Sequence, residues 1–197
     1  MLDWLKNINK EYPDFWKDYL AKFEKKPSRY VMLKTDKSGT NHLKDVLYSF
    51  GAIGVVDSQV LVGDVFETVL LQYKYLHDNS LPNTFLVESR LPKMPEPQAI
   101  EALVNYIGNA VLVGYRIHHD VDLINEALEK LHCGRLRNEA LDIEIMFKKY
   151  KESDKNIHLE DILKEFKISL PENATVTDEA YGIGLLFVKL KTRLGIK

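Results

Sequence analysis

The sequence predicts an α/β fold with a mixed sheet, and two patterns support this prediction. Three strand-like runs lie close together at 30–35, 47–56 and 59–71, as expected for an antiparallel meander. Further along, the apolar run at 110–115 leads directly into a helical pattern at 120–131, which is typical of a buried and largely parallel part of a sheet. Antiparallel strands followed by parallel ones make a mixed sheet.

The chain begins with a predicted amphipathic helix. Residues 13–26 start with a proline suited to a helix start, and aromatic side chains recur there at helical spacing. Because "KKPS" breaks this pattern at 25–28, we expect residues 1–28 to be an N-terminal helical extension that packs on a single domain over 29–197. The alternative is that the aromatic face of this helix binds a partner protein.

The remaining elements follow from turn residues and helical spacing. Asp57 and Ser58 stand at hairpin spacing between the second and third strands. Residues 73–94 have no clear period and contain two prolines, which suggests an excursion across the surface. Gly182 and Gly184 fall in the last predicted helix, where they favour close packing. The further helices are predicted over 96–108, 141–151, 159–167 and 178–194.

The composition excludes several classes of protein. The 197 residues are 45% hydrophobic, which is enough for the core of one domain. The formal charge of -2 gives no overall basic surface, so any recognition of phosphate has to be local. Cys133 is the only cysteine, which excludes an intrachain disulfide and fits a reducing compartment. The polar N-terminus and the lack of an apolar run of about 18 residues predict a cytoplasmic protein without a membrane span.

Three further segments have recognisable patterns: "GAIGVV" at 51–56, "AVLVGYRIHHDVDLINEAL" at 110–128 and "HLEDILKEFKISLPENATVTDEAYGIGLLFVKL" at 158–190. They resemble the ribonuclease H-like 3'-5' exonucleases of the DEDDh type. They are similar in particular to the epsilon proofreading subunit of bacterial DNA polymerase III. With its flanks, the resemblance covers residues 29–195. It implies a ribonuclease H-like fold, with a mixed five-stranded sheet flanked by helices, and a bacterial protein.

The resemblance also implies a type of chemistry. In this family an Asp-x-Glu pair on the first strand and two later aspartates hold two divalent cations, Mg²⁺ or Mn²⁺. A histidine five residues before the last aspartate acts as the general base. Two such cations generate the nucleophile and stabilise the leaving oxygen of a phosphodiester. Carboxylates supply the oxygen ligands and the negative charge that these cations need.

The first-strand pair of the family is altered in this chain. Gly39 of "TDKSGTN" sets the register against the family pattern Asp-Thr-Glu-Thr-Thr-Gly. Lys34 then stands at the position of the first Asp, and Asp36 at that of the Glu. Since side chains on one face of a strand alternate with period two, shifting by two residues offers only Asp36 and Ser38. The expected metal-ligand position is therefore substituted by Lys34.

The later positions are partly retained. Asp120 and Asp178 match the two later aspartates, although each would also serve as a cap at the start of its predicted helix. Asn173 stands five residues before Asp178, where the family has its histidine. An amide has no group that titrates near neutral pH, so Asn173 cannot take a proton from water. The resemblance thus leaves Asp36, Asp120 and Asp178 as remnant metal ligands and no intact catalytic set.

The charges at these positions argue against a two-metal site. Lys34 with Asp36, Asp120 and Asp178 sums to about -2, against about -4 in an intact site. An ammonium group about 4 Å from a dication is repelled by on the order of 8 kcal/mol at an effective dielectric constant of 20. We therefore expect no cofactor, with Mg²⁺ or Mn²⁺ needed only for residual activity. Our hypothesis is that the Lys34 ammonium lies among the three aspartates and replaces a metal.

These observations lead to one preferred function and two alternatives. The preferred function is a catalytically inactive exonuclease-like domain, a pseudo-exonuclease, that binds single-stranded or 3'-terminal nucleic acid or a protein partner. The first alternative is a weak metal-dependent 3'-5' exonuclease acting on such DNA or RNA through Asp36, Asp120 and Asp178. The second is a partner-binding domain without nucleic-acid affinity. Because the chain ends soon after the last predicted helix, we expect no polymerase-binding tail of the kind found in longer proofreading subunits.

Other polar clusters have less support from their spacing. His118 and His119 lie near Asp122 and His132, but adjacent histidines have no recognised metal-site spacing here. Asp142 matches a common family position and is equally suited to cap a helix. No glycine-rich phosphate loop, Ser-His-Asp arrangement or zinc cysteine set is present in the sequence.

Overall fold

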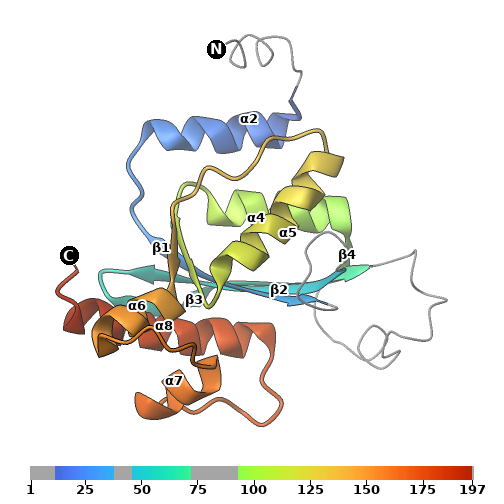
Figure 1. Ribbon diagram of the computed structural model, residues 1–197. Coiled ribbons are helices and arrows are strands. Elements are labelled where there is room, and N and C mark those ends of the chain that lie inside the picture. Colours follow the sequence, from blue (N-terminus) through green and yellow to red (C-terminus); the bar gives the residue numbers. More distant parts are fainter. Residues whose placement is uncertain (1–11, 38–45, 72–92, 197) are drawn as a thin grey trace.

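A mixed sheet forms the centre of the fold. The computed structural model describes residues 12–37, 46–71 and 93–196, and in these the sheet has six strands in the order β4-β3-β2-β1-β5-β6 (Figure 1). Strands β1 to β3 pair antiparallel, and the other neighbours pair parallel. The strands are β1 Tyr30–Lys37, β2 Leu47–Val56, β3 Gln59–Leu71, β4 Lys93–Pro95, β5 Val111–Gly114 and β6 Ala140–Asp142.

The prediction of a mixed α/β sheet is confirmed, but five strands is wrong for this chain, because the sheet has six. Strands β4 and β6 have three residues each, too few for an alternating pattern to show in the sequence. The predicted hairpin between β2 and β3 is confirmed. Asp57 and Ser58 have φ of 49° and 64°, as a tight two-residue turn requires. The predicted surface excursion falls mostly outside the described residues.

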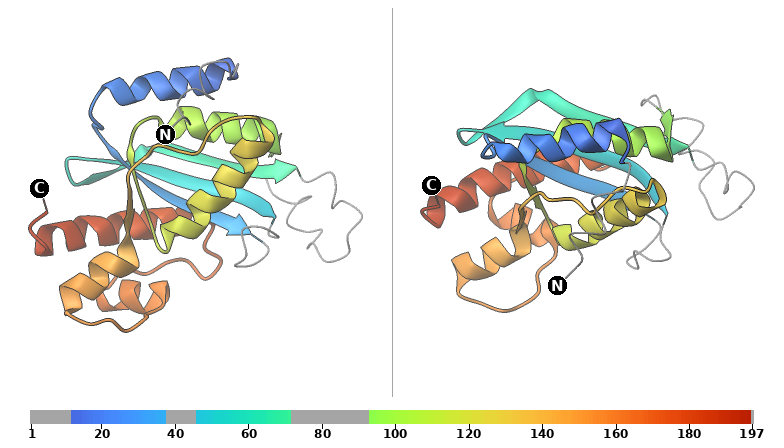
Figure 2. Two further views of the ribbon diagram at one scale, coloured as in Figure 1. Left: turned by 45° about the horizontal axis from the view of Figure 1, so that its top comes forward. Right: turned by 90° about the horizontal axis from the view of Figure 1, so that it is seen from above.

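Helices cover both faces of the sheet. Figure 1 shows α2, α4 and α5 on one side and α6, α7 and α8 on the other, and the views in Figure 2 agree. Each layer encloses its own buried apolar cluster against the sheet. The helices are α2 Asp14–Ala21, α4 Glu96–Ile107, α5 Ile117–Lys130, α6 Ile143–Lys151, α7 Leu159–Glu165 and α8 Val176–Arg193, with a 3₁₀ turn over Lys22–Glu24.

Strand β1 divides its side chains between these two layers. Val31 and Leu33 belong to the cluster under α4 and α5, whereas Met32 belongs to the cluster under α8. Because side chains alternate along a strand, Lys34 and Asp36 continue the face of Met32. The same alternation directs Thr35 toward α5. The end of β1 therefore presents polar side chains to both helical layers.

The helix α2 buries its aromatic face on the rest of the chain. Trp16 and Tyr19 are 1% and 0% exposed, and their rings stack at 4.6 Å between centroids. The Tyr19 hydroxyl donates to Asn138 Oδ1 at 2.7 Å and accepts from the backbone N–H of Arg137 at 2.7 Å. Burial raises the pKa of Tyr19 to about 12. Trp16 and Tyr19 of this aromatic face are therefore covered within the chain, and binding of a partner protein through the helix stays a prediction.

Three further expectations can be compared with the described residues. Gly182 permits close packing as predicted, because a Cβ there would lie 2.8 Å from Leu170 Cδ2. Cys133 is a free, buried side chain. Within the described ranges, no helix combines the length and apolar character that crossing a membrane requires.

Candidate functional site

A cavity of about 470 Å³ lies where the end of β1 meets the start of α8. It takes side chains from β1, β2 and β3 and from the segment that leads into α8. The lining residues are Lys34, Thr35, Asp36, Lys37, Ser49, Glu67, Asn173, Ala174, Thr175, Val176 and Glu179. The structure thus brings together Lys34, Asp36 and Asn173, three of the positions that the sequence indicates.

The first turn of α8 can sit on the sheet because Gly51 has no side chain. A Cβ at Gly51 would lie 2.5 Å from Val176 C and 2.6 Å from Thr177 N, both backbone atoms that cannot easily move. Gly51 pairs with Lys34 on one side and with Glu67 on the other. The first turn of α8 is therefore placed between a lysine and a glutamate of the sheet.

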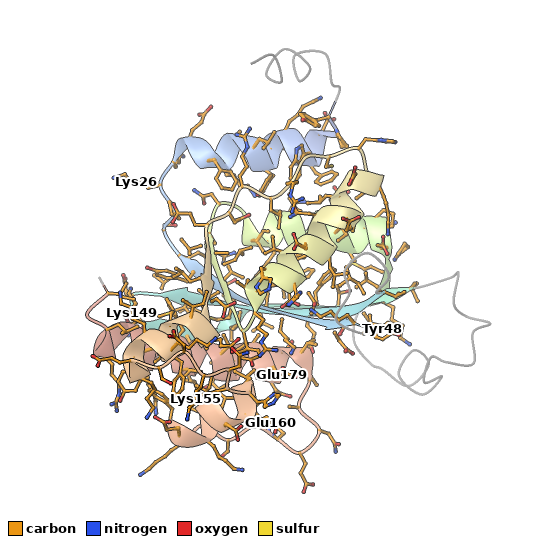
Figure 3. All side chains as sticks on the ribbon, viewed as in Figure 1. Lys26, Tyr48, Lys149, Lys155, Glu160 and Glu179 are labelled. Atoms are coloured by element: carbon orange, nitrogen blue, oxygen red, sulfur yellow. The ribbon has the colours of Figure 1, made fainter. Side chains whose placement is uncertain are left out.

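Lys34 forms an ion pair with a carboxylate that the sequence analysis missed. Its Nζ lies 2.7 Å from Glu179 Oε2, and the two side chains are 27% and 29% exposed. Glu179 comes from the N-terminal part of α8, which lies against the sheet (Figure 3). The hypothesis that Lys34 pairs with Asp36, Asp120 and Asp178 is wrong in its partners, because the ion pair that Lys34 forms is with Glu179.

Asp178 has a structural role at the start of α8. Helix α8 begins at Val176 rather than 178, so Asp178 is the third helical residue, and Thr175 is the N-cap. Asp178 Oδ2 accepts from the Thr175 backbone N–H at 2.9 Å, and Thr175 Oγ1 accepts from the Asp178 N–H at 3.2 Å. This reciprocal pair is a capping box. It uses the Asp178 carboxylate for the helix start and leaves the neighbouring Glu179 to reach Lys34.

Asp120 is buried and held from β1. Helix α5 begins at Ile117, three residues earlier than predicted, with Arg116 as its N-cap, so the cap interpretation of Asp120 is wrong. Asp120 is 3% exposed. Its Oδ1 accepts from Thr35 Oγ1 at 2.7 Å and lies 2.6 Å from Lys37 Nζ. The ammonium group beside Asp120 is therefore that of Lys37, a residue that the sequence analysis did not single out.

Asp36 lies between these two pairs without a lysine partner in the described residues. Its Oδ1 accepts from the Lys37 backbone N–H at 2.9 Å. Burial raises the pKa of Asp36, and the nearby Glu179 carboxylate adds to this, while Lys34 and Lys37 oppose it. Asp36 consequently holds a proton more readily than an aspartate in water.

Two further cavity residues complete the polar lining. Asn173 lines the cavity and offers an amide where a general base would stand. Glu67 was not predicted, although it is the only acidic residue in the otherwise uncharged "VFETVLL" of β3. Its Oε1 is buried and has no hydrogen-bond partner among the described residues. No sequence pattern indicated its place, because it follows from the pairing of β3 with β2 at Gly51.

A second cavity adjoins the first across the Lys34–Glu179 pair. It measures about 770 Å³ and shares Lys34, Ala174 and Glu179 with the first cavity. Tyr115 lines it, and burial raises the pKa of this phenol. Its other lining residues are His158, Leu159, Glu160, Leu163, Lys164, Ile168, Ser169, Leu170, Pro171 and Glu172. The two cavities form adjacent spaces divided by one partly exposed ion pair.

The histidine cluster does not form a metal site in the described residues. The rings of His118 and His119 lie 4.1 Å apart between centroids, and burial followed by the charge of His118 lowers the pKa of His119. Asp122 is instead bonded to Arg135 at 2.8 Å. Asp142 is the N-cap of α6, where its Oδ1 accepts from the Glu144 N–H at 2.8 Å. The cap interpretation of Asp142 is confirmed.

The acidic residues do not fit a pair of divalent cations. Asp120 and Glu179 are each bonded to a lysine, and Asp178 is used in a helix cap. In the described parts of the chain, no group of three or more His, Cys, Asp or Glu side chains could hold a metal ion. A cation entering here would first have to displace an ammonium group from a carboxylate. We therefore derive no metal-dependent step from this arrangement.

Comparison with known proteins gives distant but consistent relatives. No family model matches the chain. DNA polymerase III PolC-type from Halalkalibacterium halodurans is 22% identical over 83% of this chain, and the corresponding protein from Staphylococcus haemolyticus is 19% identical over 84%. In both cases the match covers 11% of the relative. The chain therefore spans about a tenth of the length of these curated relatives.

Solved structures of exonuclease I share the fold. A product-bound exonuclease I superposes with a TM-score of 0.63 at 15% identity, over 86% of this chain and 45% of that one. E. coli exonuclease I in complex with a dT13 oligonucleotide gives a TM-score of 0.65 at 16% identity, over 85% and 42%. The chain therefore has the fold of exonuclease I, which agrees with the ribonuclease H-like fold that the resemblance implied, and is similar in sequence to PolC-type DNA polymerase III.

Proposed function

We propose that this chain is a 3'-5' exonuclease-family domain that has lost catalysis and binds single-stranded or 3'-terminal nucleic acid in its cleft. The observation that carries the proposal is the pair of internal ion pairs, Lys34–Glu179 and Lys37–Asp120. Lys37 places an ammonium group on Asp120, a carboxylate that a catalytic cation would need. Lys34 stands at a metal-ligand position of the family and is held there by Glu179. We take the protein to be bacterial and cytoplasmic, with residues 1–28 as an extension of the domain over 29–197.

The electrostatic argument rests on what a dication would replace. Lys37 is 19% exposed and its partner Asp120 is 5% exposed, so the ammonium group is largely enclosed. A divalent cation about 4 Å from it would be repelled by on the order of 8 kcal/mol at an effective dielectric constant of 20. Removing the lysine from its carboxylate would leave a buried unpaired charge, which is also costly. Both routes oppose metal binding at this end of β1.

The proton-transfer argument is independent of the metal. Hydrolysis needs a group that takes a proton from the attacking water at neutral pH. Asn173 cannot do so, and Asp36 is a partly buried carboxylate in the lining of the same cavity. Asp36 alone does not replace a two-cation site, because the leaving oxygen would still lack its counter-charge. Loss of ligands and loss of the base therefore point to the same conclusion.

Support for nucleic-acid binding comes from the cavities and from the structural relatives. Exonuclease I has been crystallised with dT13 and dA16 oligonucleotides. Here the two adjoining cavities contain the exposed Lys164 and the partly exposed Lys34 together with Tyr115, which supply cations for phosphates and an aromatic ring for stacking. The same cavities would suit a strand end that is held but not cut.

A nuclease and binding assay tests both parts of the proposal. Labelled single-stranded DNA and RNA are incubated with the protein in Mg²⁺ or Mn²⁺, with Asp120→Asn as the control. We expect no digestion above background, and oligonucleotide binding, followed by fluorescence anisotropy, that weakens as salt rises. Digestion abolished by Asp120→Asn would instead establish the alternative, a weak metal-dependent 3'-5' exonuclease. Digestion unchanged in the variant identifies a contaminating nuclease.

The oligonucleotide-binding measurement distinguishes a nucleic-acid-binding domain from a domain that binds only protein. Lys34→Gln and Lys164→Gln each remove one cation from the lining of these cavities. Each is expected to weaken oligonucleotide binding and to reduce the salt dependence by about one phosphate contact. The absence of any salt-dependent binding would contradict the nucleic-acid part and leave a protein-binding domain.

A further inference from the structure

A basic pocket lies near the C-terminal end of α8, whereas the candidate functional site lies at the start of this helix. It measures about 370 Å³ and is formed where α6, α7 and the C-terminal half of α8 come together (Figure 1). We call it the C-terminal pocket, and it is lined by Tyr150, Glu165, Phe166, Lys167, Lys189 and Arg193. With about 1.5 Å of rise per residue, Lys189 stands about 15 Å further along the helix axis than Glu179. The pocket is therefore separate from the candidate functional site.

Arg193 is held in one orientation by the aromatic side chains. Its guanidinium carbon lies 5.4 Å from the ring centroids of both Tyr150 and Phe166. One of its nitrogens donates to the Tyr150 hydroxyl at 2.7 Å. Stacking of this kind leaves the edge of the guanidinium plane available and reduces the entropy lost when it binds an anion.

The cations of the pocket lack carboxylate partners among the described residues. Lys189 Nζ donates to the Phe166 carbonyl at 2.9 Å, which is a neutral acceptor, and Lys167 is exposed. The one acidic lining residue, Glu165, is already paired with Lys151 at 2.7 Å. Three positive charges thus converge on the pocket while its single carboxylate is neutralised from outside.

The cations that form ion pairs are arranged differently. Most of the ion pairs described join a lysine or arginine to a carboxylate of another element, as in Arg116 with Glu144 and Lys130 with Glu96. The whole chain has a formal charge of -2, so a local excess of three cations is not a general property of its surface. The C-terminal pocket is therefore a local basic site with an oriented arginine.

We propose that the C-terminal pocket binds a phosphate group. A phosphate oxyanion matches the fork of a fixed guanidinium and uses the two lysines as further charge partners. It carries up to about two negative charges near neutral pH, against three cations in the pocket. The phosphate is either that of a small phosphate compound or a phosphodiester of a nucleic acid that also reaches this end of α8. The first source does not depend on the proposed function, and the second extends it.

Amide NMR titration of the full chain tests the proposal with two probes, inorganic phosphate and a dT oligonucleotide. We expect saturable shifts of the amides around Lys167, Lys189 and Arg193. A Lys167→Gln/Arg193→Gln variant should bind the effective probe about tenfold more weakly, because charge-assisted hydrogen bonds are lost. The matched control is Lys155→Gln, an exposed lysine in the loop after α6 (Figure 3), which should change the affinity by less than about twofold.

The outcomes distinguish the two sources and the failure of the proposal. If only inorganic phosphate shifts the amides of the C-terminal pocket, its ligand is a small phosphate compound. If the oligonucleotide shifts these amides and the double variant abolishes the shifts, the ligand is a phosphodiester. The single variant Lys167→Gln shows whether weaker binding reflects lost charge rather than misfolding. It removes one exposed charge and leaves the stacked Arg193 in place. No saturable shift with either probe, or equal weakening by Lys155→Gln, would overturn the proposal. Oligonucleotide binding confined to the cleft residues, together with no phosphate-induced shift at the C-terminal pocket, overturns it while leaving the proposed function intact.

Discussion

The two lysine–carboxylate pairs at the end of β1 differ in burial, and the difference separates a structural role from an adjustable one. In the Lys37–Asp120 pair the side chains are 19% and 5% exposed, and Thr35 adds a hydrogen bond of 2.7 Å. In the Lys34–Glu179 pair they are 27% and 29% exposed. Solvent screens the second pair more strongly. We therefore regard Lys37–Asp120 as part of the fold and Lys34–Glu179 as a weaker contact between two cavities.

Removing the buried carboxylate is expected to have the largest effect. Asp120→Ala leaves Lys37 and Thr35 without this acceptor in an enclosed site. It should lower the free energy of unfolding by about 3 kcal/mol, the lower range for breaking a buried ion pair. Urea denaturation followed by circular dichroism measures this loss. Asp120→Asn, which keeps an acceptor for Thr35, should lose less, and a loss below about 1 kcal/mol for Asp120→Ala would contradict a structural role.

Displacing α8 should affect one pair and spare the other. Gly51→Ala puts a Cβ 2.5 Å from the backbone of Val176, so α8 must move and the Lys34–Glu179 contact should be lost. We expect a destabilisation of about 2 kcal/mol, typical of overpacking. Gly63→Ala is the matched control, because no atom lies within 4 Å of a Cβ there. Equal urea midpoints for the two variants would argue against the close approach of α8.

Breaking the exposed pair should have a small effect on stability. Lys34→Met leaves Glu179 partly solvated, so the free energy of unfolding should fall by less than about 1 kcal/mol. A double-mutant cycle with Glu179→Gln isolates the coupling between the two side chains. A second cycle with Lys37→Met and Asp120→Asn gives the coupling in the buried pair. Equal coupling energies in the two cycles would remove the distinction drawn above.

The smallest effect is expected at Asp36, and it depends on pH. Its pKa is raised from 3.8 in the folded state, chiefly by burial, so the folded state binds the proton more tightly than the unfolded chain. Stability from this group therefore falls as pH rises from about 3.8 through the raised folded pKa. Asp36→Asn should be more stable than the wild type above this window and lose that advantage at lower pH. Parallel pH profiles of the urea midpoint for the two proteins would contradict the raised pKa.

The sequence predicted the parts of the fold that depend on local patterns. The meander, the Asp57–Ser58 turn and the step from β5 to α5 follow from alternation, turn residues and helical spacing. The three-residue strands β4 and β6 could not be predicted in this way, because they exist only through pairing with β3 and β5. Local sequence patterns therefore predict the long elements but do not predict the short strands at the two edges of the sheet.

The sequence predicted several residues that line the candidate site, but not which side chains form ion pairs there. Of the five positions that the resemblance indicated, Lys34, Asp36 and Asn173 line one cavity, whereas its lining residues do not include Asp120 and Asp178. The resemblance could not show that the Asp178 carboxylate accepts a hydrogen bond from the Thr175 N–H while Glu179 forms the ion pair with Lys34. Adjacent acidic residues at a helix start look equivalent in sequence, and the capping box decides between them.

Direct measurement of Mn²⁺ binding tests the central claim, that internal ammonium groups occupy the places of the catalytic cations. Isothermal titration of the wild-type chain with Mn²⁺ should show no saturable site, whereas Lys34→Asp/Lys37→Gln, which restores a carboxylate and removes both ammonium groups, should gain one. Folding of both proteins is checked by circular dichroism before titration. A saturable Mn²⁺ site in the wild type that is lost in Asp120→Asn would contradict the claim.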